Sequence, residues 1–238
     1  MNSYLDGLFS LKGHVGIITG ASKGIGLGIA EVLVRAGAKV YNFSRSQHQE
    51  KEFDFKNNLI DLKVDIQDEN AVKNALNKVI AAEGKLDFLI NNAGISFKKR
   101  AEEFPDEEYA KIQKTDLESV FKLCKACFPY LKQSQYVGRI VSITSMSAYM
   151  GFNGVVPYCM MKSGLMGLTK GLAEEWHDDN ILVNSIAPGW VLTEINAKMF
   201  ADNPDRKAAA LNKPILKKFI DPKEIGYMAL FLLSNASL

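Results

Sequence analysis

A glycine-rich turn between an apolar run and a helical segment constrains the fold of this chain more than any other feature. His14–Thr19 is a short apolar run of strand type, Gly20–Gly26 (Gly-Ala-Ser-Lys-Gly-Ile-Gly) is the turn, and Leu27–Ala36 repeats apolar side chains at helical spacing. The next strand-like run, Lys39–Phe43, completes the pattern of a β–α–β unit. In that context the glycines let the backbone approach a pyrophosphate, and the helix N-terminus offers N–H groups to it. A tight turn without a ligand is the alternative, but the second strand favours a nucleotide site.

The rest of the chain alternates strand-like and helix-like segments. Further apolar runs of strand length occur at Leu59–Val64, Leu86–Ile90, Arg139–Thr144 and Ile181–Ile186. Segments with helical periodicity lie between them, near Glu69–Ala82, Asp106–Leu131 and Val156–His177. Strands that alternate with helices of this length are typical of a parallel, doubly wound α/β sheet. A length of 238 residues fits one such Rossmann-type domain, so we expect residues 1–238 to form a single domain.

Composition excludes several classes of protein. A hydrophobic content of 47% with 24% charged residues is ordinary for a globular protein, and a net charge of +2 argues against a nucleic-acid partner. No apolar run reaches the length of a transmembrane helix, and the N-terminal residues lack the charged and apolar regions of a signal peptide. We therefore expect no membrane partner and a cytoplasmic location.

The cysteines include one pair at the spacing of a redox motif or of half a zinc site, Cys124 and Cys127. They lie on or near the apolar stripe of the predicted helix Asp106–Leu131, no second pair exists, and the three histidines are scattered. Buried apolar cysteines are therefore the better interpretation. We predict no disulfide and no metal.

Tyr158 and Lys162 are the strongest candidates for chemistry. A step of four residues places both side chains on one face of a helix. An ammonium beside a phenol favours the phenolate, and so brings a group that titrates near about pH 10 toward neutral pH. Such a phenol can exchange a proton with a substrate. By itself the pair is weak, because many surface helices carry Tyr and Lys at this spacing as solvated side chains.

Five motifs together resemble the short-chain dehydrogenase/reductase family. They are Thr19–Gly26 (TGxxxGxG), Asn91–Gly94 (NNAG), Ser145 thirteen residues before Tyr158, the Tyr158–Lys162 pair (YxxxK), and Pro188–Thr193 (PGxxxT). The resemblance runs from about Leu11 onward, and five motifs in order are far more specific than any one of them. It implies hydride transfer between a nicotinamide and a carbonyl or alcohol carbon of a small molecule.

The resemblance implies a role for each catalytic residue. Tyr158 would donate the proton to the carbonyl oxygen, and Ser145 a hydrogen bond. Lys162 would favour the phenolate and hold the nicotinamide ribose. Ser142, Thr144 and Ser147 are competing hydroxyls near Ser145, and only the spacing to Tyr158 selects Ser145.

The identity of the coenzyme is predicted from charge. An acid that would bind the ribose 2′-hydroxyl of NAD is missing after the second strand, where Arg45 stands. Arg45 and Lys23 could instead pair with a 2′-phosphate, although both could be solvated side chains. We therefore predict NADP rather than NAD. The residues that the resemblance assigns to the coenzyme are Gly20, Ser22, Lys23, Gly24, Ile25, Gly26, Ser44, Arg45, Asp65, Ile66, Asn92, Ala93, Gly94, Tyr158, Lys162, Pro188, Gly189, Val191 and Thr193.

Two features depart from the family pattern. Asp116 stands where the family has an Asn whose neighbourhood holds a proton-relaying water, so we count Asp116 with the catalytic residues. Asp keeps the size and an acceptor but loses the amide donor, and its charge near Lys162 alters the electrostatics. We expect the relay to survive through a backbone carbonyl and water. The second departure is that the chain stops at Leu238, where the family continues into a last strand. Either the sequence is cut before that strand or the strand is absent; in both cases we predict a sheet of this chain without its seventh strand.

The substrate is predicted from weaker signals. Ala187–Glu194 with Asp202–Pro204, and Ala173–Trp176, are similar to sugar-acid dehydrogenases of the gluconate 5-dehydrogenase type, and the basic cluster Lys98–Arg100 could attract an anion. A 3-oxoacyl carrier-protein reductase shares every motif, and there the cluster would dock the acidic carrier. A non-catalytic NADP-binding regulator is the third alternative; retention of Ser145, Tyr158 and Lys162 argues against it.

Two further expectations concern the lid and the assembly. The irregular segment at about residues 190–219 is predicted to be a substrate lid that decides the substrate. The resemblance also implies a homotetramer built on the two long helices. We expect their outer faces to carry Phe121, Cys124, Phe128, Met161, Leu165 and Leu168.

Overall fold

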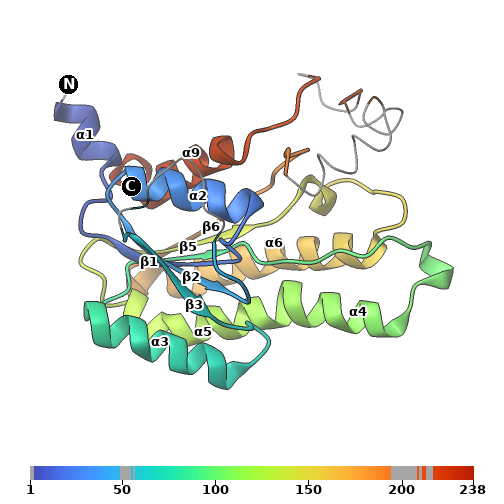
Figure 1. Cartoon of the computed structure of the whole chain (residues 1–238), viewed down its shortest axis with the longest axis horizontal. Coiled ribbons are helices and arrows are strands. Elements are labelled where there is room, and N and C mark those ends of the chain that lie inside the picture. Colours follow the sequence, from blue (N-terminus) through green and yellow to red (C-terminus); the bar gives the residue numbers. More distant parts are fainter. Residues whose placement is uncertain (1–2, 49–54, 56, 194–207, 209–210, 213–216) are drawn as a thin grey trace.

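The sheet of the protein has six parallel strands in the order β3-β2-β1-β4-β5-β6 (Figure 1). The structure is a computed structural model and describes residues 3–48, 55, 57–193, 208, 211–212 and 217–238. The strands are β1 (Val15–Thr19), β2 (Lys39–Ser44), β3 (Leu59–Lys63), β4 (Phe88–Asn91), β5 (Gly138–Ile143) and β6 (Ile181–Ile186). The predicted doubly wound parallel sheet is confirmed. Residues Asn235–Ser237 form a 3₁₀ turn, so the described residues add no seventh strand.

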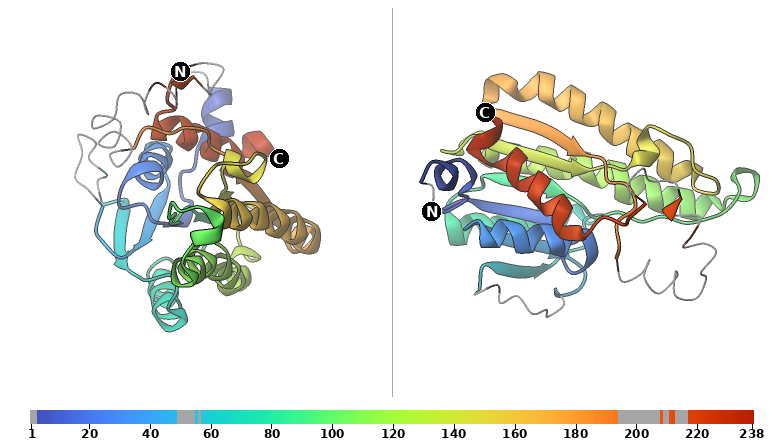
Figure 2. Two further views of the ribbon diagram at one scale, coloured as in Figure 1. Left: turned by 90° about the vertical axis from the view of Figure 1, so that its right-hand side faces the viewer. Right: turned by 90° about the horizontal axis from the view of Figure 1, so that it is seen from above.

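Helices cover both faces of the sheet. On one face, α2 (Gly24–Arg35) and α9 (Pro222–Leu233) lie side by side, with the short α1 (Ser3–Phe9) near their ends (Figures 1 and 2). The other face is covered by α3 (Glu69–Glu83), α5 (Ser119–Leu131) and α6 (Val156–Trp176).

Each face has its own hydrophobic core, because successive strand residues point to opposite sides. On β1, Ile17 packs with the core under α3, α5 and α6, and Ile18 packs with the core under α2 and α9. Both side chains are completely buried. A strand buried on both faces reads as a continuous apolar run, which explains why β1 could be recognised from the sequence.

The predicted helix Asp106–Leu131 is helical over its whole length, but its hydrogen-bond pattern changes partway along. It consists of α4 (Asp106–Gln113), a π-helical turn over Lys114–Glu118, and α5. Within the turn, the Thr115 hydroxyl donates to the Lys111 carbonyl at 2.8 Å. Such turns occur mostly as single interruptions, frequently at functional sites, and this one carries Asp116.

The predicted outer face of the long helices is partly wrong. Cys124 and Leu165 are buried in the core under the sheet, because the sheet needs an apolar cover along its whole width, and Met161 is buried as well. Phe121 is exposed, whereas Phe128 and Leu168 are half-buried beside the core. The interpretation of Cys124 and Cys127 as buried residues is confirmed, and burial raises the pKa of Cys124 to about 12.

Most of the predicted lid, including residues 194–207 and 213–216, lies outside the described residues. None of the helices in the described part of the chain combines the length and the hydropathy that a membrane crossing requires. The described residues also contain no group of three His, Cys, Asp or Glu side chains arranged to hold a metal ion.

Candidate active site

The candidate site lies at the carboxyl ends of β1 and β4. The strand order reverses at this point, since the chain runs from β1 outward to β3 and then returns to β4 on the other side of β1. The connections that follow β1 and β4 therefore leave toward opposite faces, and a crevice forms between them. Ligands of open α/β sheets bind at such a switch point.

Hydrogen bonds tie the segment after β4 to the segment after β1. The Thr19 hydroxyl accepts from the backbone N–H groups of Asn92 at 3.0 Å and Ala93 at 2.9 Å. The Asn92 side-chain amide donates to the carbonyls of Thr19 at 2.9 Å and Gly20 at 3.1 Å. Two motifs that are far apart in the sequence thus form one rigid wall of the site.

The glycines of the turn are required by close approach. A Cβ atom on Gly26 would lie 2.4 Å from the Gly20 carbonyl oxygen and 2.5 Å from the Asn92 amide nitrogen. Gly20 and Gly24 have φ values of +70° and +57°, which strain other residues. Helix α2 starts after Lys23 with no side-chain cap, so its first N–H groups are available to an anion. These features fit the pyrophosphate of a dinucleotide.

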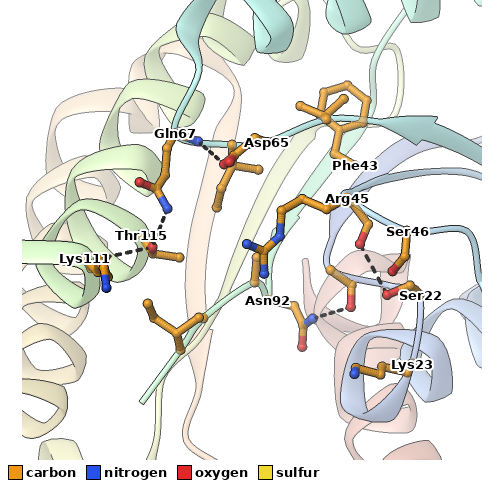
Figure 3. A pocket seen from close by; sticks show the side chains of 17 residues that line it. Ser22, Lys23, Phe43, Arg45, Ser46, Asp65, Gln67, Asn92, Lys111 and Thr115 are labelled. Atoms are coloured by element: carbon orange, nitrogen blue, oxygen red, sulfur yellow. Dashed lines mark hydrogen bonds between the residues drawn. The ribbon is translucent and has the colours of Figure 1, made fainter. Parts of the chain in front are cut away.

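A cavity of about 380 Å³ extends from this turn across the ends of β2 and β3 (Figure 3). Ten of the residues predicted to bind the coenzyme line it: Gly20, Ser22, Lys23, Ser44, Arg45, Asp65, Ile66, Asn92, Ala93 and Gly94. Seven further lining residues were not predicted: Phe43, Ser46, Val64, Gln67, Ile95, Lys111 and Thr115.

Some of these missed residues carry a readable signal. Lys111 and Thr115 are separated by one helical turn, the same spacing that singled out Tyr158 and Lys162. Gln67 lies two residues beyond Asp65 at the end of β3; its backbone N–H donates to Asp65 and its side-chain amide donates to Thr115 at 3.0 Å. That second contact joins β3 to the π-helical turn and could not be read from the sequence.

The charges in this cavity are separated in space. The exposed Arg45 side chain extends into the middle of the cavity, and Lys23 lies on the side of Ser22 and Ser46 (Figure 3). Asp65 lies on the opposite side, next to Gln67 (Figure 3). The Ser44 hydroxyl donates to that of Ser22 at 3.2 Å, which links the end of β2 to the glycine turn.

A second cavity, of about 370 Å³, brings the three predicted catalytic residues together. Ser145, Tyr158 and Lys162 all line it. So do five further predicted coenzyme residues, Ile25, Pro188, Gly189, Val191 and Thr193, together with the unpredicted Ser96, Ile143, Thr144 and Trp190. The two cavities share Asn92, Gly94 and Ile95, so one long ligand can occupy both.

The structure separates the hydroxyls that competed in the sequence. Ser142 is buried and accepts from Asn91, while Thr144 is buried and donates to the Ile186 carbonyl. Ser147 is also buried. Ser145 is half-buried in the cavity wall, and its oxygen accepts from the Ser147 N–H at 3.1 Å, so its own proton can be donated into the cavity.

Lys162 is held between three groups. Its ammonium lies 5.4 Å from the centre of the Tyr158 ring, donates to the Ile143 carbonyl at 3.1 Å, and lies 3.4 Å from Asp116 Oδ2. Both charged side chains are almost fully buried. Burial raises the pKa of Asp116, whereas the Lys162 ammonium and the hydrogen bond from the Ile95 N–H act to lower this pKa. Asp116, Gly24 and Gly26 were predicted as site residues but line neither cavity.

The comparisons with known proteins agree with this geometry. A family profile described as "Enoyl-(Acyl carrier protein) reductase" matches residues 20–238. The chain belongs to the short-chain dehydrogenase/reductase family. It is therefore an oxidoreductase of the kind that acts on CH–OH groups, and its family binds a nicotinamide coenzyme.

Two curated relatives cover nearly the whole chain. The 2-dehydro-3-deoxy-D-gluconate 5-dehydrogenase of Bacillus subtilis (strain 168) is 32% identical over 98% of this chain and 92% of its own. The 3-oxoacyl-[acyl-carrier-protein] reductase of Escherichia coli (strain K12) is 33% identical over 95% of this chain and 92% of its own. Their near-equal identity supports the family without selecting a substrate.

A solved structure from Beutenbergia cavernae, described as that of a candidate NAD(P)-dependent gluconate 5-dehydrogenase, also resembles the chain. The TM-score is 0.85 with 30% identity, covering 97% of this chain and 93% of that one. That crystal contains NADP at low occupancy.

Proposed function

We propose that this member of the family is an NADP(H)-dependent oxidoreductase that transfers a hydride between the nicotinamide and the carbonyl or secondary alcohol of a sugar acid or polyol. The observation that carries the catalytic part is the shared wall of the two cavities. Ser145, Tyr158 and Lys162 line the second cavity, and the first cavity, on the other side of that wall, begins at the glycine turn. The coenzyme supplies and accepts the hydride.

The chain's own residues manage the proton. Ser145 donates a hydrogen bond to the substrate oxygen, where negative charge grows as a ketone is reduced. Tyr158 gives that oxygen its proton, and Lys162 favours the phenolate that remains. The Ile143 carbonyl, 3.1 Å from the Lys162 ammonium, keeps the lysine beneath the phenol ring and provides the backbone acceptor expected for a proton relay.

The preference for NADP rests on the cations of the first cavity. Arg45 offers a planar fork that suits a phosphate, and Lys23 adds a second charge from the glycine turn. Lys111 also lines this cavity, but it pairs with Glu108 at 2.6 Å and contributes less. A preference for NAD remains the alternative coenzyme.

The basic cluster after the Asn-Asn-Ala-Gly motif does not help to select the substrate. Lys99 pairs with Glu103 at 2.7 Å and Arg100 pairs with Glu102 at 2.5 Å. These neighbours offset the charges of Lys99 and Arg100, two of the three side chains that were expected to attract an anion or an acidic carrier. The sugar-acid proposal is therefore supported by sequence similarity around Trp190 and Trp176 more than by electrostatics.

A 3-oxoacyl carrier-protein reductase is the second candidate function, because a relative with that activity matches the chain equally well. A non-catalytic regulator is the third, favoured only by Asp116. The homotetramer and the cytoplasmic location predicted from the sequence also remain proposals.

One experiment separates these functions. NADPH oxidation is measured against keto-sugar acids, 3-oxoacyl thioesters and simple diketones, with NADH in parallel. We expect turnover with a keto-sugar acid and faster reaction with NADPH. Turnover restricted to the thioesters would establish the carrier-protein alternative, and binding of NADPH without any turnover would establish the regulator.

A further inference from the structure

We propose that Asp116 is a positioning residue that pairs with Lys162 and thereby sets the pH at which Tyr158 exchanges its proton. This inference rests on the proposed function for its catalytic meaning. It concerns a property of the folded chain, however, that can be measured without any substrate.

The geometry gives Asp116 two separate contacts. Its Oδ1 accepts from the Ile95 N–H at 2.8 Å, which anchors the carboxylate to the segment after β4. Its Oδ2 is buried without a hydrogen-bond partner and lies 3.4 Å from the Lys162 ammonium. One oxygen therefore fixes the side chain, and the other is left facing the lysine.

Two features of the backbone make this approach possible. The π-helical turn over Lys114–Glu118 carries Asp116 toward α6, which packs against it. Gly94 leaves space between the charges, because a Cβ atom there would lie 2.8 Å from Asp116 Oδ2 and 3.3 Å from the Lys162 ammonium. Any larger residue at position 94 would push the pair apart.

The pair changes the electrostatics around the phenol. A lone ammonium 5.4 Å from the ring centre favours the phenolate, since opposite charges attract at this range. An ionised carboxylate 3.4 Å from that ammonium opposes its field, because the net charge of the pair is then zero. The favourable field of the pair at the phenol is therefore weaker than that of Lys162 alone.

Few other charges face this cluster. The π-helical turn contributes Asp116, and α6 contributes Lys162 and Tyr158. β5 contributes only the Ile143 carbonyl, and the segment after β4 contributes the Ile95 N–H. Among the described residues that line the catalytic cavity, Tyr158 and Lys162 are the titratable ones.

The test is a spectroscopic titration of Tyr158. Tyrosinate absorbance is followed against pH for the wild type and for Asp116→Asn, and the curve of the matching Tyr158→Phe protein is subtracted from each. Asparagine keeps the shape and can still accept from Ile95. We expect the Tyr158 signal of Asp116→Asn to inflect about one pH unit lower than that of the wild type, the lower end of the range for a nearby charge.

Glu118→Gln is the matched control. It makes the same change of charge in the same π-helical turn, but Glu118 is exposed and pairs with Lys122. Its titration should follow the wild type. If Asp116→Asn does not fold, Asp116→Ser removes the same charge with a smaller side chain.

The outcomes separate this inference from the proposed function. Superimposable wild-type and Asp116→Asn curves would overturn the inference, as would a shift to higher pH, which would mean that Lys162 had lost its proton. A downward shift supports it even in a protein that turns over no tested substrate. Where turnover exists, alcohol oxidation by Asp116→Asn should gain activity at lower pH in parallel with the absorbance.

Discussion

Tyr158 offers a direct test of the catalytic assignment. Tyr158→Phe removes the hydroxyl but keeps the ring that covers Lys162. We expect kcat to fall at least about a hundredfold, the usual scale for loss of a general acid–base group, with NADPH affinity nearly unchanged. Steady-state kinetics and coenzyme titration measure both quantities. Tyr149→Phe, at a side chain that is 68% exposed, is the control. Near-normal turnover by Tyr158→Phe would contradict the role.

Arg45 decides the coenzyme in our proposal. Arg45→Asp places a carboxylate where the guanidinium extends into the cavity, so a 2′-phosphate is repelled and a 2′-hydroxyl gains an acceptor. We expect the ratio of NADPH to NADH affinity to reverse. Titrating both proteins with both coenzymes measures the ratio, and Arg100→Asp, on the surface, controls for net charge. A wild type that already prefers NADH would contradict the assignment.

The sequence could predict which candidate catalytic residues come together in one cavity but not all of their surroundings. Ser145, Tyr158 and Lys162 follow from fixed spacings within one helix and one strand end, so they could be named in advance. The proximity of Asp116 to Lys162 was also expected. The different surroundings of the two Asp116 carboxylate oxygens were not expected: Oδ1 accepts from the Ile95 N–H, and Oδ2 faces Lys162. Gln67 could not be predicted, because its bond to Thr115 depends on how β3 and the π-helical turn pack together.

The first turn of helix α2 packs closely against Gly20 and Asn92, and a substitution at Gly26 tests whether this close packing is required. In Gly26→Ala the new methyl group would meet a backbone carbonyl and the Asn92 amide at less than van der Waals distance. We expect a loss of about 1–3 kcal/mol in the free energy of unfolding, as for other overpacked sites, together with weaker NADPH binding. Denaturant unfolding and coenzyme titration measure the two effects.

Gly7→Ala is the matched control for that prediction. Gly7 also lies in a helix, but a Cβ atom there would have nothing within 4 Å. The substitution should leave NADPH affinity unchanged and alter stability by no more than about 1 kcal/mol in the favourable direction. Equal stability of both variants would mean that the turn can open without penalty, and the argument for a required glycine would fail.

Strands could be predicted more reliably than helix details. β1 to β6 appear within two residues of their expected positions, because each is a short apolar run with turn residues beside it. Helix α9 was missed although its start is readable: Asp221 caps it, Pro222 follows, and Glu224 completes a capping box. The π-helical turn was not predicted; its Asp116 contacts Ile95 and Lys162, which are distant in the sequence.

At the level of the whole molecule, topology explains why the site forms where it does. The two halves of the sheet wind outward from β1 and β4, so the turn after β1 and the segment after β4 meet over the same edge. Buried polar groups then fix that edge: Asn42 on β2 accepts from the Ala21 N–H at 2.8 Å and donates to Asp61 on β3 at 2.7 Å. The coenzyme groove is therefore built on rigid elements.

The assembly of the protein can be predicted from what remains exposed on the long helices. Phe121 on α5 is 44% exposed and Met160 on α6 is 49% exposed, although Cys124, Met161 and Leu165 proved to be buried. Large apolar side chains on the outer faces of two neighbouring helices favour burial against a second copy of the chain.

We expect a homotetramer, and we expect Phe121→Asp to shift it toward smaller species while the chain stays folded. Light scattering at micromolar concentration, with circular dichroism, measures both. Leu5→Asp, at an equally exposed position on α1, should leave the mass unchanged; a monomeric wild type would refute the prediction, because these side chains would then be stable in water without a partner.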